Sequence, residues 1–170
     1  MIIVNTGEGK GKTTAAVGQA MRALGQGLDV AFAQFMKRDN QAGEQAMLRN
    51  LLGDAFFAGG KGFFRSEKDR DVHRQAALEV LTWAQQKLDI LSKPSLLVLD
   101  ESLYALGAGL LLREEIESLL DKSQTAQVHV LLTGRGLPDW LLSRADLVTE
   151  MVMRKHPHEQ GVKAQKGIEF

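Results

Sequence analysis

Residues 6–14 read Thr6-Gly7-Glu8-Gly9-Lys10-Gly11-Lys12-Thr13-Thr14, and this stretch decides the fold of the chain. It follows the β-branched apolar run Ile2-Ile3-Val4 and precedes apolar residues at helical spacing, namely Ala16, Ala20, Ala23 and Leu24. The predicted order is therefore strand, glycine-rich loop, helix. The backbone N–H groups and the dipole at the start of such a helix favour an anion. The stretch predicts a phosphate-binding loop.

Each residue type in this loop has a physical task. The glycines let the backbone curl so that successive amides face inward, Lys12 reaches phosphate oxygens, and the Thr13 hydroxyl can ligate Mg²⁺. The usual pattern places its first glycine where this chain has Thr6, so the loop is one residue short. A shorter loop is not expected to cradle a triphosphate in the common orientation. We therefore do not expect ordinary transfer of a γ-phosphate.

Strands and helices alternate along the rest of the chain. Apolar runs predict further strands at residues 30–35, 96–101, 128–133 and 147–153. Helices are predicted at residues 44–52, at 67–91, between 101 and 128, and after Pro138. This alternation is typical of an α/β fold with a mostly parallel central sheet and helices on both faces. With 170 residues, the chain is predicted to form a single domain, residues 1–170.

Charged residues follow two of these predicted strands. Asp100 and Glu101 end one strand, and Arg135 lies between Gly134 and Gly136 after another. In parallel sheets, ligands bind at the carboxyl ends of the strands. A carboxylate there can hold Mg²⁺ directly or through water, and a guanidinium can clamp phosphate oxygens. We expect these residues to face the phosphate loop.

Composition excludes several kinds of partner. Lys plus Arg and Asp plus Glu both number 21, so no positive excess favours nucleic acid or an anionic membrane surface. No apolar run approaches the roughly 20 residues that span a bilayer. The chain has no Cys, and Met1 leads into the first strand without a signal-like leader, so we expect a cytoplasmic protein. His156, His158 and Glu159 form a short polar cluster to which we assign no metal role.

Five segments, in order along nearly the whole chain, resemble the phosphate-loop class of corrinoid adenosyltransferases. The final segment makes the resemblance specific, because a phosphate loop alone is common to many families. The segments are residues 6–16, Gln34-Phe35-Met36-Lys37, Val98-Leu99-Asp100-Glu101, Thr133-Gly134-Arg135-Gly136 and Gly161-Val162-Lys163-Ala164-Gln165-Lys166-Gly167-Ile168-Glu169-Phe170.

This resemblance implies an activity and a set of partners. Members of the family transfer the 5′-deoxyadenosyl group of ATP to Co(I) of a reduced corrinoid, giving adenosylcobalamin or another adenosyl-corrinoid and releasing triphosphate. They are RecA-like homodimers that use Mg²⁺ or Mn²⁺ and bind ATP in a reversed sense along the loop. A flavoprotein is a candidate electron donor. Reversal agrees with the short loop, because it leaves C5′ exposed to the cobalt nucleophile.

The resemblance also assigns roles to particular residues. Lys12 neutralises the phosphates and Arg135 supports the phosphate chain, while Thr13 and Glu101 hold the metal ion. Glu8 is expected to point away from the phosphates or toward the metal, because a carboxylate facing them would oppose binding. The residues expected to bind ATP or the corrinoid are Gly7, Glu8, Gly9, Lys10, Gly11, Lys12, Thr13, Thr14, Arg22 and Phe63.

The glycine-rich segment at residues 59–64 is the predicted corrinoid loop. Family members push the lower axial ligand away from cobalt with aromatic side chains of a Gly-Phe-x-Trp-like sequence, which makes Co(II) easier to reduce. The matching stretch here is Gly62-Phe63-Phe64-Arg65. Phe63 is retained and Arg65 replaces the second aromatic, so either Phe64 substitutes for it or displacement is weaker.

Two alternatives stay open from the sequence. One is a nucleotide- or corrinoid-binding module without turnover, which would bind its ligands and form no product. The other is a general phosphate-loop ATPase, which would release orthophosphate. The neutral charge balance and the short loop count against the ATPase.

Overall fold

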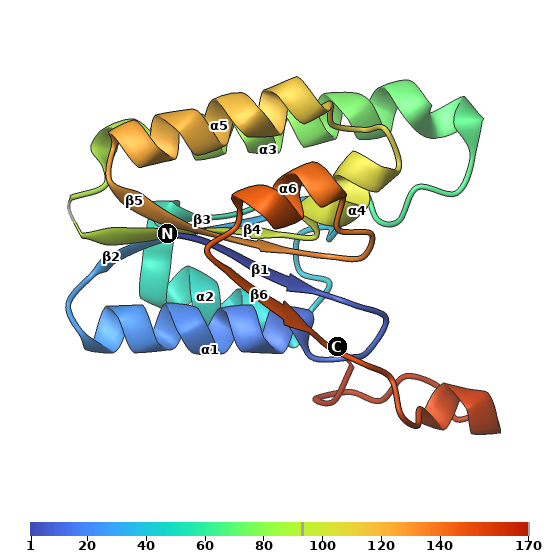
Figure 1. The fold of residues 1–170 in the computed structure, drawn as a ribbon. Helices are drawn as coiled ribbons and strands as arrows, with labels where there is room; N and C mark the ends of the chain where they lie inside the picture. Colours follow the sequence, from blue (N-terminus) through green and yellow to red (C-terminus); the bar gives the residue numbers. More distant parts are fainter. Residues whose placement is uncertain (93, 170) are drawn as a thin grey trace.

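Six parallel strands form one sheet in the computed structural model, which describes residues 1–92 and 94–169 (Figure 1). Phe170, which closes the tail motif, and the side chain of His158 lie outside the described residues. The strand order is β3-β2-β4-β5-β1-β6. The strands are β1 (Ile2–Thr6), β2 (Asp29–Gln34), β3 (Phe56–Ala58), β4 (Ser95–Asp100), β5 (Val128–Thr133) and β6 (Leu147–Glu150).

Helices cover both faces of this sheet, as predicted (Figure 1). One face carries α1 (Lys12–Gly25) and α2 (Gly43–Leu52). The other carries α3 (Arg70–Ile90), α4 (Ser102–Gly107), α5 (Arg113–Thr125) and α6 (Asp139–Arg144). Short 3₁₀ turns occupy Gly53–Ala55, Glu67–Asp69 and Pro157–Gln160. In the described part of the chain, no helix is both long and apolar enough to cross a membrane.

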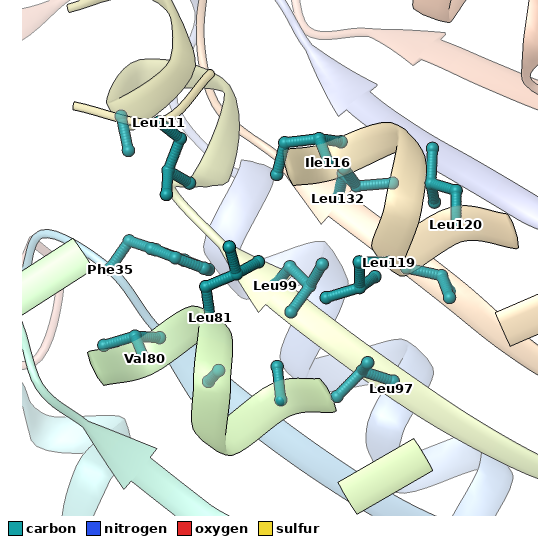
Figure 2. Packing of buried hydrophobic residues seen from close by; sticks show 14 of the residues in the cluster. Phe35, Val80, Leu81, Leu97, Leu99, Leu111, Ile116, Leu119, Leu120 and Leu132 are labelled. Atoms are coloured by element: carbon teal, nitrogen blue, oxygen red, sulfur yellow. The ribbon is translucent and has the colours of Figure 1, made fainter. Parts of the chain in front are cut away.

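Alternate residues of the central strands supply the two cores. In β4, Leu97 and Leu99 pack toward α3 and α5, whereas Leu96 and Val98 pack toward α1 and α2. Figure 2 shows Leu97 and Leu99 among the side chains of the larger core. Each strand therefore reads as a continuous apolar run, because both of its faces are buried. This is why the sequence predicted these strands well.

The first helix follows the glycine-rich loop, as predicted, and runs from Lys12 to Gly25. It presents Ala16, Ala20 and Ala23 to the sheet, and all three are buried. After the helix, Gly27 adopts a left-handed φ of 76° and its N–H donates to the Leu24 carbonyl. Glycine takes this conformation without the steric cost of a Cβ.

Several boundaries differ from the sequence prediction. The strand β3 was not predicted, because it is only three residues long and follows a 3₁₀ turn without a break in composition. The last strand ends at Glu150, before the polar tail begins. The helical segment after Glu101 is divided into α4 and α5, and the predicted helix at 67–91 begins with a 3₁₀ turn.

Candidate functional site

The main cavity of the molecule lies where β1, β2, β4 and β5 end, and its volume is about 1030 Å³. This is at the large end of the range for ligand pockets, roughly 300–1,000 Å³. Residues 8–14 of the glycine-rich loop line one side. Lys37, Glu101, Phe63 and Arg135 line the others. The structure thus brings together most of the residues that the sequence singled out.

Lys12 is held inside the curl of the loop. Its Nζ donates to the carbonyl oxygens of Gly7 and Gly9, at 2.7 and 2.8 Å. Burial lowers the pKa of Lys12, and the nearby carboxylate of Glu101 opposes this shift. The ammonium group therefore lies where an anion held by the loop amides would contact it.

The loop rests against the chain that follows β6. The N–H of Gly9 donates to the Met151 carbonyl at 2.7 Å. A Cβ at Gly9 would lie 2.7 Å from that same oxygen, and a Cβ at Gly7 would lie 2.4 Å from it. Gly7 also has a φ of 99°. Two of the glycines are therefore required by close backbone packing as well as by the shape of the loop.

Asp100 is fully buried and orients the start of α1. Its Oδ1 accepts hydrogen bonds from the hydroxyls of Thr13 and Thr133, at 2.8 and 2.7 Å. Its Oδ2 accepts a bond of 3.1 Å from the Gln34 amide on the neighbouring strand β2. The carboxylate thus has defined partners on three elements.

Lys37 is the cation that lies beside the Asp100 carboxylate. Its Nζ lies 2.6 Å from Glu44 Oε1, 3.3 Å from Asp100 Oδ2 and 3.4 Å from the Thr13 hydroxyl. Burial alone would lower the pKa of Lys37, but the two carboxylates outweigh it and the pKa is raised. Lys37 belongs to the Gln34–Lys37 segment that carries part of the resemblance, and no local pattern assigned it a role.

Glu101 occupies an unusual backbone conformation at the end of β4. Its φ is 62°, in the left-handed region, and its N–H donates to the Thr133 hydroxyl at 3.0 Å. Burial raises the pKa of the Glu101 carboxyl, and neighbouring Asp100 raises it further. Asn40 and Gln127 share this conformation, so it is the position of Glu101 in the cavity wall, together with its backbone strain, that marks it as a site residue.

The donor set around Thr13 and Glu101 fits Mg²⁺. Mg²⁺ prefers oxygen ligands and is often bound by one or two carboxylates together with substrate phosphates. The described residues contain no cluster of three or more His, Cys, Asp or Glu side chains suited to a metal. The protein therefore offers a hydroxyl and a carboxylate at the cavity wall rather than a closed cage.

Arg135 is paired with Glu8 across the mouth of the cavity. The two side chains lie 2.7 Å apart at Nη1 and Oε2, and both are more than half exposed. Gly134 and Gly136, with φ of 139° and 76°, form the turn that presents Arg135. The structure thus gives the Glu8 carboxylate a partner that the sequence did not reveal.

Arg22 lies away from this cavity. It is in the last turn of α1, exposed, with Nη1 3.4 Å from Gln19 Oε1. Lys12 is in the first turn of the same helix, so roughly 15 Å of helix separates the two side chains. Within the described residues of one chain, the structure does not bring Arg22 to the site.

The aromatic end of the cavity is formed by Phe63 and Tyr104. Their ring centroids lie 5.2 Å apart at an interplanar angle of 73°, an edge-to-face contact. The Tyr104 hydroxyl donates to the Phe64 carbonyl at 3.1 Å. The Phe64 ring itself turns away to meet His73 and the Arg70 guanidinium. Tyr104 lies three residues after Glu101, and that helical spacing was the one sequence signal for it.

The comparison with protein families gives a whole-chain match. A family model described as ATP:corrinoid adenosyltransferase BtuR/CobO/CobP matches residues 1–170. Among curated proteins, a corrinoid adenosyltransferase of Salmonella typhimurium is 41% identical over 175 residues, covering 100% of this chain and 85% of that protein. One from Sinorhizobium sp. is 38% identical over 173 residues, covering 100% and 80%.

Solved structures support the fold. The DNA-packaging ATPase B204 of Sulfolobus Turreted Icosahedral Virus superimposes with a TM-score of 0.56 at 15% identity, covering 94% of this chain and 78% of that chain. The flagellar accessory protein FlaH of Methanocaldococcus jannaschii has a TM-score of 0.50 at 11% identity, covering 88% and 69%. At such low identity these likenesses show the shared fold alone, and they confirm the predicted RecA-like phosphate-loop architecture.

Proposed function

Since this chain belongs to the family of ATP:corrinoid adenosyltransferases, we propose that the cavity at the carboxyl ends of the strands holds ATP at one end and the corrinoid at the other. The observation that carries this proposal is that Lys12 and Glu101 line the same cavity as the aromatic side chain of Phe63. One end offers inward amides and cations, which suit phosphates. The other offers aromatic surface, which suits a large, flat, mainly apolar macrocycle.

In the proposed complex, the phosphate loop and its neighbours bind the triphosphate of ATP and its metal ion. Residues 7–14 surround the phosphates, with the Lys12 ammonium neutralising them and Arg135 supporting the chain from the cavity mouth. Thr13 and Glu101 hold Mg²⁺, which supplies charge to balance the phosphate oxygens. Asp100 acts through Thr13, because it accepts the hydrogen bond that orients the hydroxyl.

The chemistry demands orientation more than acid–base catalysis. Co(I) supplies an electron pair to C5′, the cobalt–carbon bond forms, and the C5′–O bond breaks. Triphosphate leaves with the electron pair of that bond. The protein must therefore hold cobalt in line with C5′ and stabilise a highly charged leaving group. Lys12 and Arg135 are the cations that this role requires.

Four further parts complete the proposal: the resemblance supports the homodimer and the flavoprotein donor, and the length and composition of the chain support the single domain and the cytoplasmic location. Residues 1–170 act as a single domain, and two copies form a symmetric homodimer. A reduced flavoprotein supplies the electron that converts Co(II) to Co(I). The proposed location of the reaction is the cytoplasm. Sedimentation of the purified protein would test the dimer.

The deciding experiment is an anaerobic assay with ATP, Mg²⁺ and chemically reduced cobalamin. The expected result is a light-sensitive alkyl-cobalt spectrum together with intact triphosphate. Orthophosphate without alkyl-cobalt would instead favour an ATPase, and ligand binding without either product would favour a binding module. Lys12→Met should lose most of the activity. Lys87→Met is the matched control, because Lys87 lies on α3 against Trp83 and outside the cavity lining.

A further inference from the structure

We infer that Tyr104 is a positioning residue that holds the Phe63 ring toward the corrinoid and thereby governs the use of Co(II) substrate. This inference rests on the proposed function of the cavity. Tyr104 lines that cavity, contacts the Phe63 ring edge-to-face and binds the next residue of the loop through its hydroxyl. It therefore restrains both the ring and the backbone of the loop.

The loop needs such a restraint. Gly59, Gly60 and Gly62 lie within it, and residues 59–65 contain no helix or strand. Phe63 is 53% exposed, so about half of its surface is open to solvent. An exposed aromatic ring on a glycine-rich loop has many accessible orientations, and each contact that selects one of them reduces the entropy lost when a ligand binds.

The other contacts of the loop act at different points. The Arg38 Nε donates to the Lys61 carbonyl at 2.7 Å. The Arg70 guanidinium lies over the Phe64 ring, 4.8 Å from its centroid. These contacts hold the backbone at residue 61 and the side chain at residue 64. The Phe63 ring, in contrast, is held by its contact with the Tyr104 ring.

Tyr104 itself is well anchored. It lies on α4 between Leu103 and Ala105, which are both fully buried. Glu101, at the start of the same helix, faces the phosphate end of the cavity. One short helix therefore carries residues at both ends of the cavity.

Phe63 is the ring that the loop offers to the macrocycle, and Tyr104 packs against that ring. Phe64 turns away from the cavity and Arg65 is exposed, so neither presents a ring beside Phe63. The Phe63 ring, held by Tyr104, is therefore the apolar surface against which one face of the macrocycle can rest. An apolar surface disfavours a polar axial ligand on that face. Co(II) without that ligand accepts one electron more readily, because the donor ligand raises the energy of the orbital that receives it.

The test compares two substrates with the full-length protein. In one assay cobalamin is reduced chemically to Co(I) before mixing; in the other Co(II) cobalamin receives its electron from chemically reduced free flavin. For Tyr104→Leu we expect the rate of alkyl-cobalt formation to fall roughly 3-fold with Co(I) substrate. With Co(II) substrate the fall should be larger by a further factor of at least about 10, which is the scale of losing one aromatic pair and one hydrogen bond. Tyr104→Phe keeps the ring and loses the hydroxyl. Its rates should therefore lie between those of the parent and those of Tyr104→Leu.

A double-mutant cycle shows whether Tyr104 acts through Phe63. If it does, Phe63→Ala combined with Tyr104→Leu should lower the Co(II) rate no further than Phe63→Ala alone. The visible spectrum of Co(II) cobalamin bound with ATP should shift toward the axially unligated form in the parent and less in Tyr104→Leu. Two results would overturn the inference: additive losses of the Co(II) rate in the double mutant, or the same spectrum for the parent and Tyr104→Leu.

A matched control separates this role from general loosening of the loop. Arg38→Gln removes the hydrogen bond from the Arg38 Nε to the Lys61 carbonyl. The ratio of Co(II) to Co(I) rates in this variant should stay close to that of the parent. An equal fall of this ratio in Arg38→Gln and Tyr104→Leu would refute a particular role for Tyr104. If the parent protein forms no alkyl-cobalt even from Co(I), it is the proposed function that fails.

Discussion

The Thr13 hydroxyl donates a hydrogen bond of 2.8 Å to the buried Asp100 carboxylate, joining residues 87 positions apart. The bond ties the first turn of α1 to the carboxyl end of β4. Because the hydroxyl hydrogen is directed toward Asp100, an oxygen lone pair of Thr13 is available to a cation. The two residues therefore form one unit, with Asp100 orienting the group that Thr13 offers to the metal.

Replacement of Thr13 tests this unit. Thr13→Val keeps the shape of the side chain and removes the hydroxyl, so the Mg²⁺ concentration for half-maximal adenosyl transfer should rise by roughly 10-fold. Thr13→Ser keeps the hydroxyl and is the control. Titration of activity against Mg²⁺ measures the effect, and an unchanged midpoint for Thr13→Val would exclude a role in metal binding.

Lys37 balances two carboxylates, and its removal should destabilise the fold. Lys37→Met leaves Asp100 fully buried without the cation that lies 3.3 Å from it, and leaves Glu44 with the Gln34 amide but without its cation. The free energy of unfolding should fall by about 1–3 kcal/mol, as for loss of a charge partner from a partly buried group. Urea denaturation measures this quantity. Lys37→Arg preserves the charge and should lose less; an equal loss would point to packing rather than charge.

The pair of Glu8 and Arg135 should matter for ATP and little for stability. Both side chains are largely exposed, and exposed ion pairs contribute roughly 0–1 kcal/mol. Arg135→Gln should raise the KM for ATP or lower kcat by about 10-fold or more, because it removes a cation from the leaving triphosphate. Glu8→Gln should change either parameter by less than about 3-fold. Steady-state kinetics would contradict this assignment if Glu8→Gln strongly tightened ATP binding.

Glu115 predicts part of the pH dependence of stability. It accepts hydrogen bonds from both terminal nitrogens of Arg74 and from the N–H of Leu112. The Arg74 guanidinium lowers the pKa of Glu115 below its ordinary value of 4.5. A lowered pKa in the folded state adds stability that is fully present above pH 4.5 and is lost as the pH falls through the folded pKa.

The measurement for Glu115 is the free energy of unfolding in urea between about pH 3 and pH 7. The parent should lose stability toward the acid end, and Glu115→Gln should show a flatter curve in that window. Glu117→Gln is the control, because Glu117 pairs with Arg113 within the same helix on a more exposed surface. Parallel curves for the parent and Glu115→Gln would show that this carboxylate does not contribute.

Much of the fold could be predicted because its central strands are buried on both faces. Apart from polar residues at their ends and His129, the strands β2, β4 and β5 are apolar, and glycines mark the loop before α1 and the end of that helix. β3 escaped prediction because three residues at a sheet edge carry too little pattern. The strand order is likewise absent from the sequence pattern, since pairing joins segments far apart in the chain.

The candidate site was predicted in part. The residues between the first strand and the first helix carried local signals, because the chemistry of a phosphate loop lies in consecutive residues. Lys37 and Tyr104 carried almost none, since their roles depend on partners from other elements: Asp100 for Lys37, and Phe63 for Tyr104. Arg22 is the opposite case. The resemblance suggested it as a nucleotide-binding residue, but it lies at the end of α1 that is far from the phosphate loop.

The amino-acid sequence was sufficient for the α/β fold, the short phosphate loop of residues 6–14 and the resemblance to corrinoid adenosyltransferases, because each depends on local order. The side-chain contacts of the site depend on the three-dimensional arrangement. It paired Thr13 with Asp100, Glu8 with Arg135 and Phe63 with Tyr104. The physical reason is that hydrogen bonds, ion pairs and ring contacts act over a few ångströms in space, and the parallel sheet alone brings the ends of distant strands to that distance.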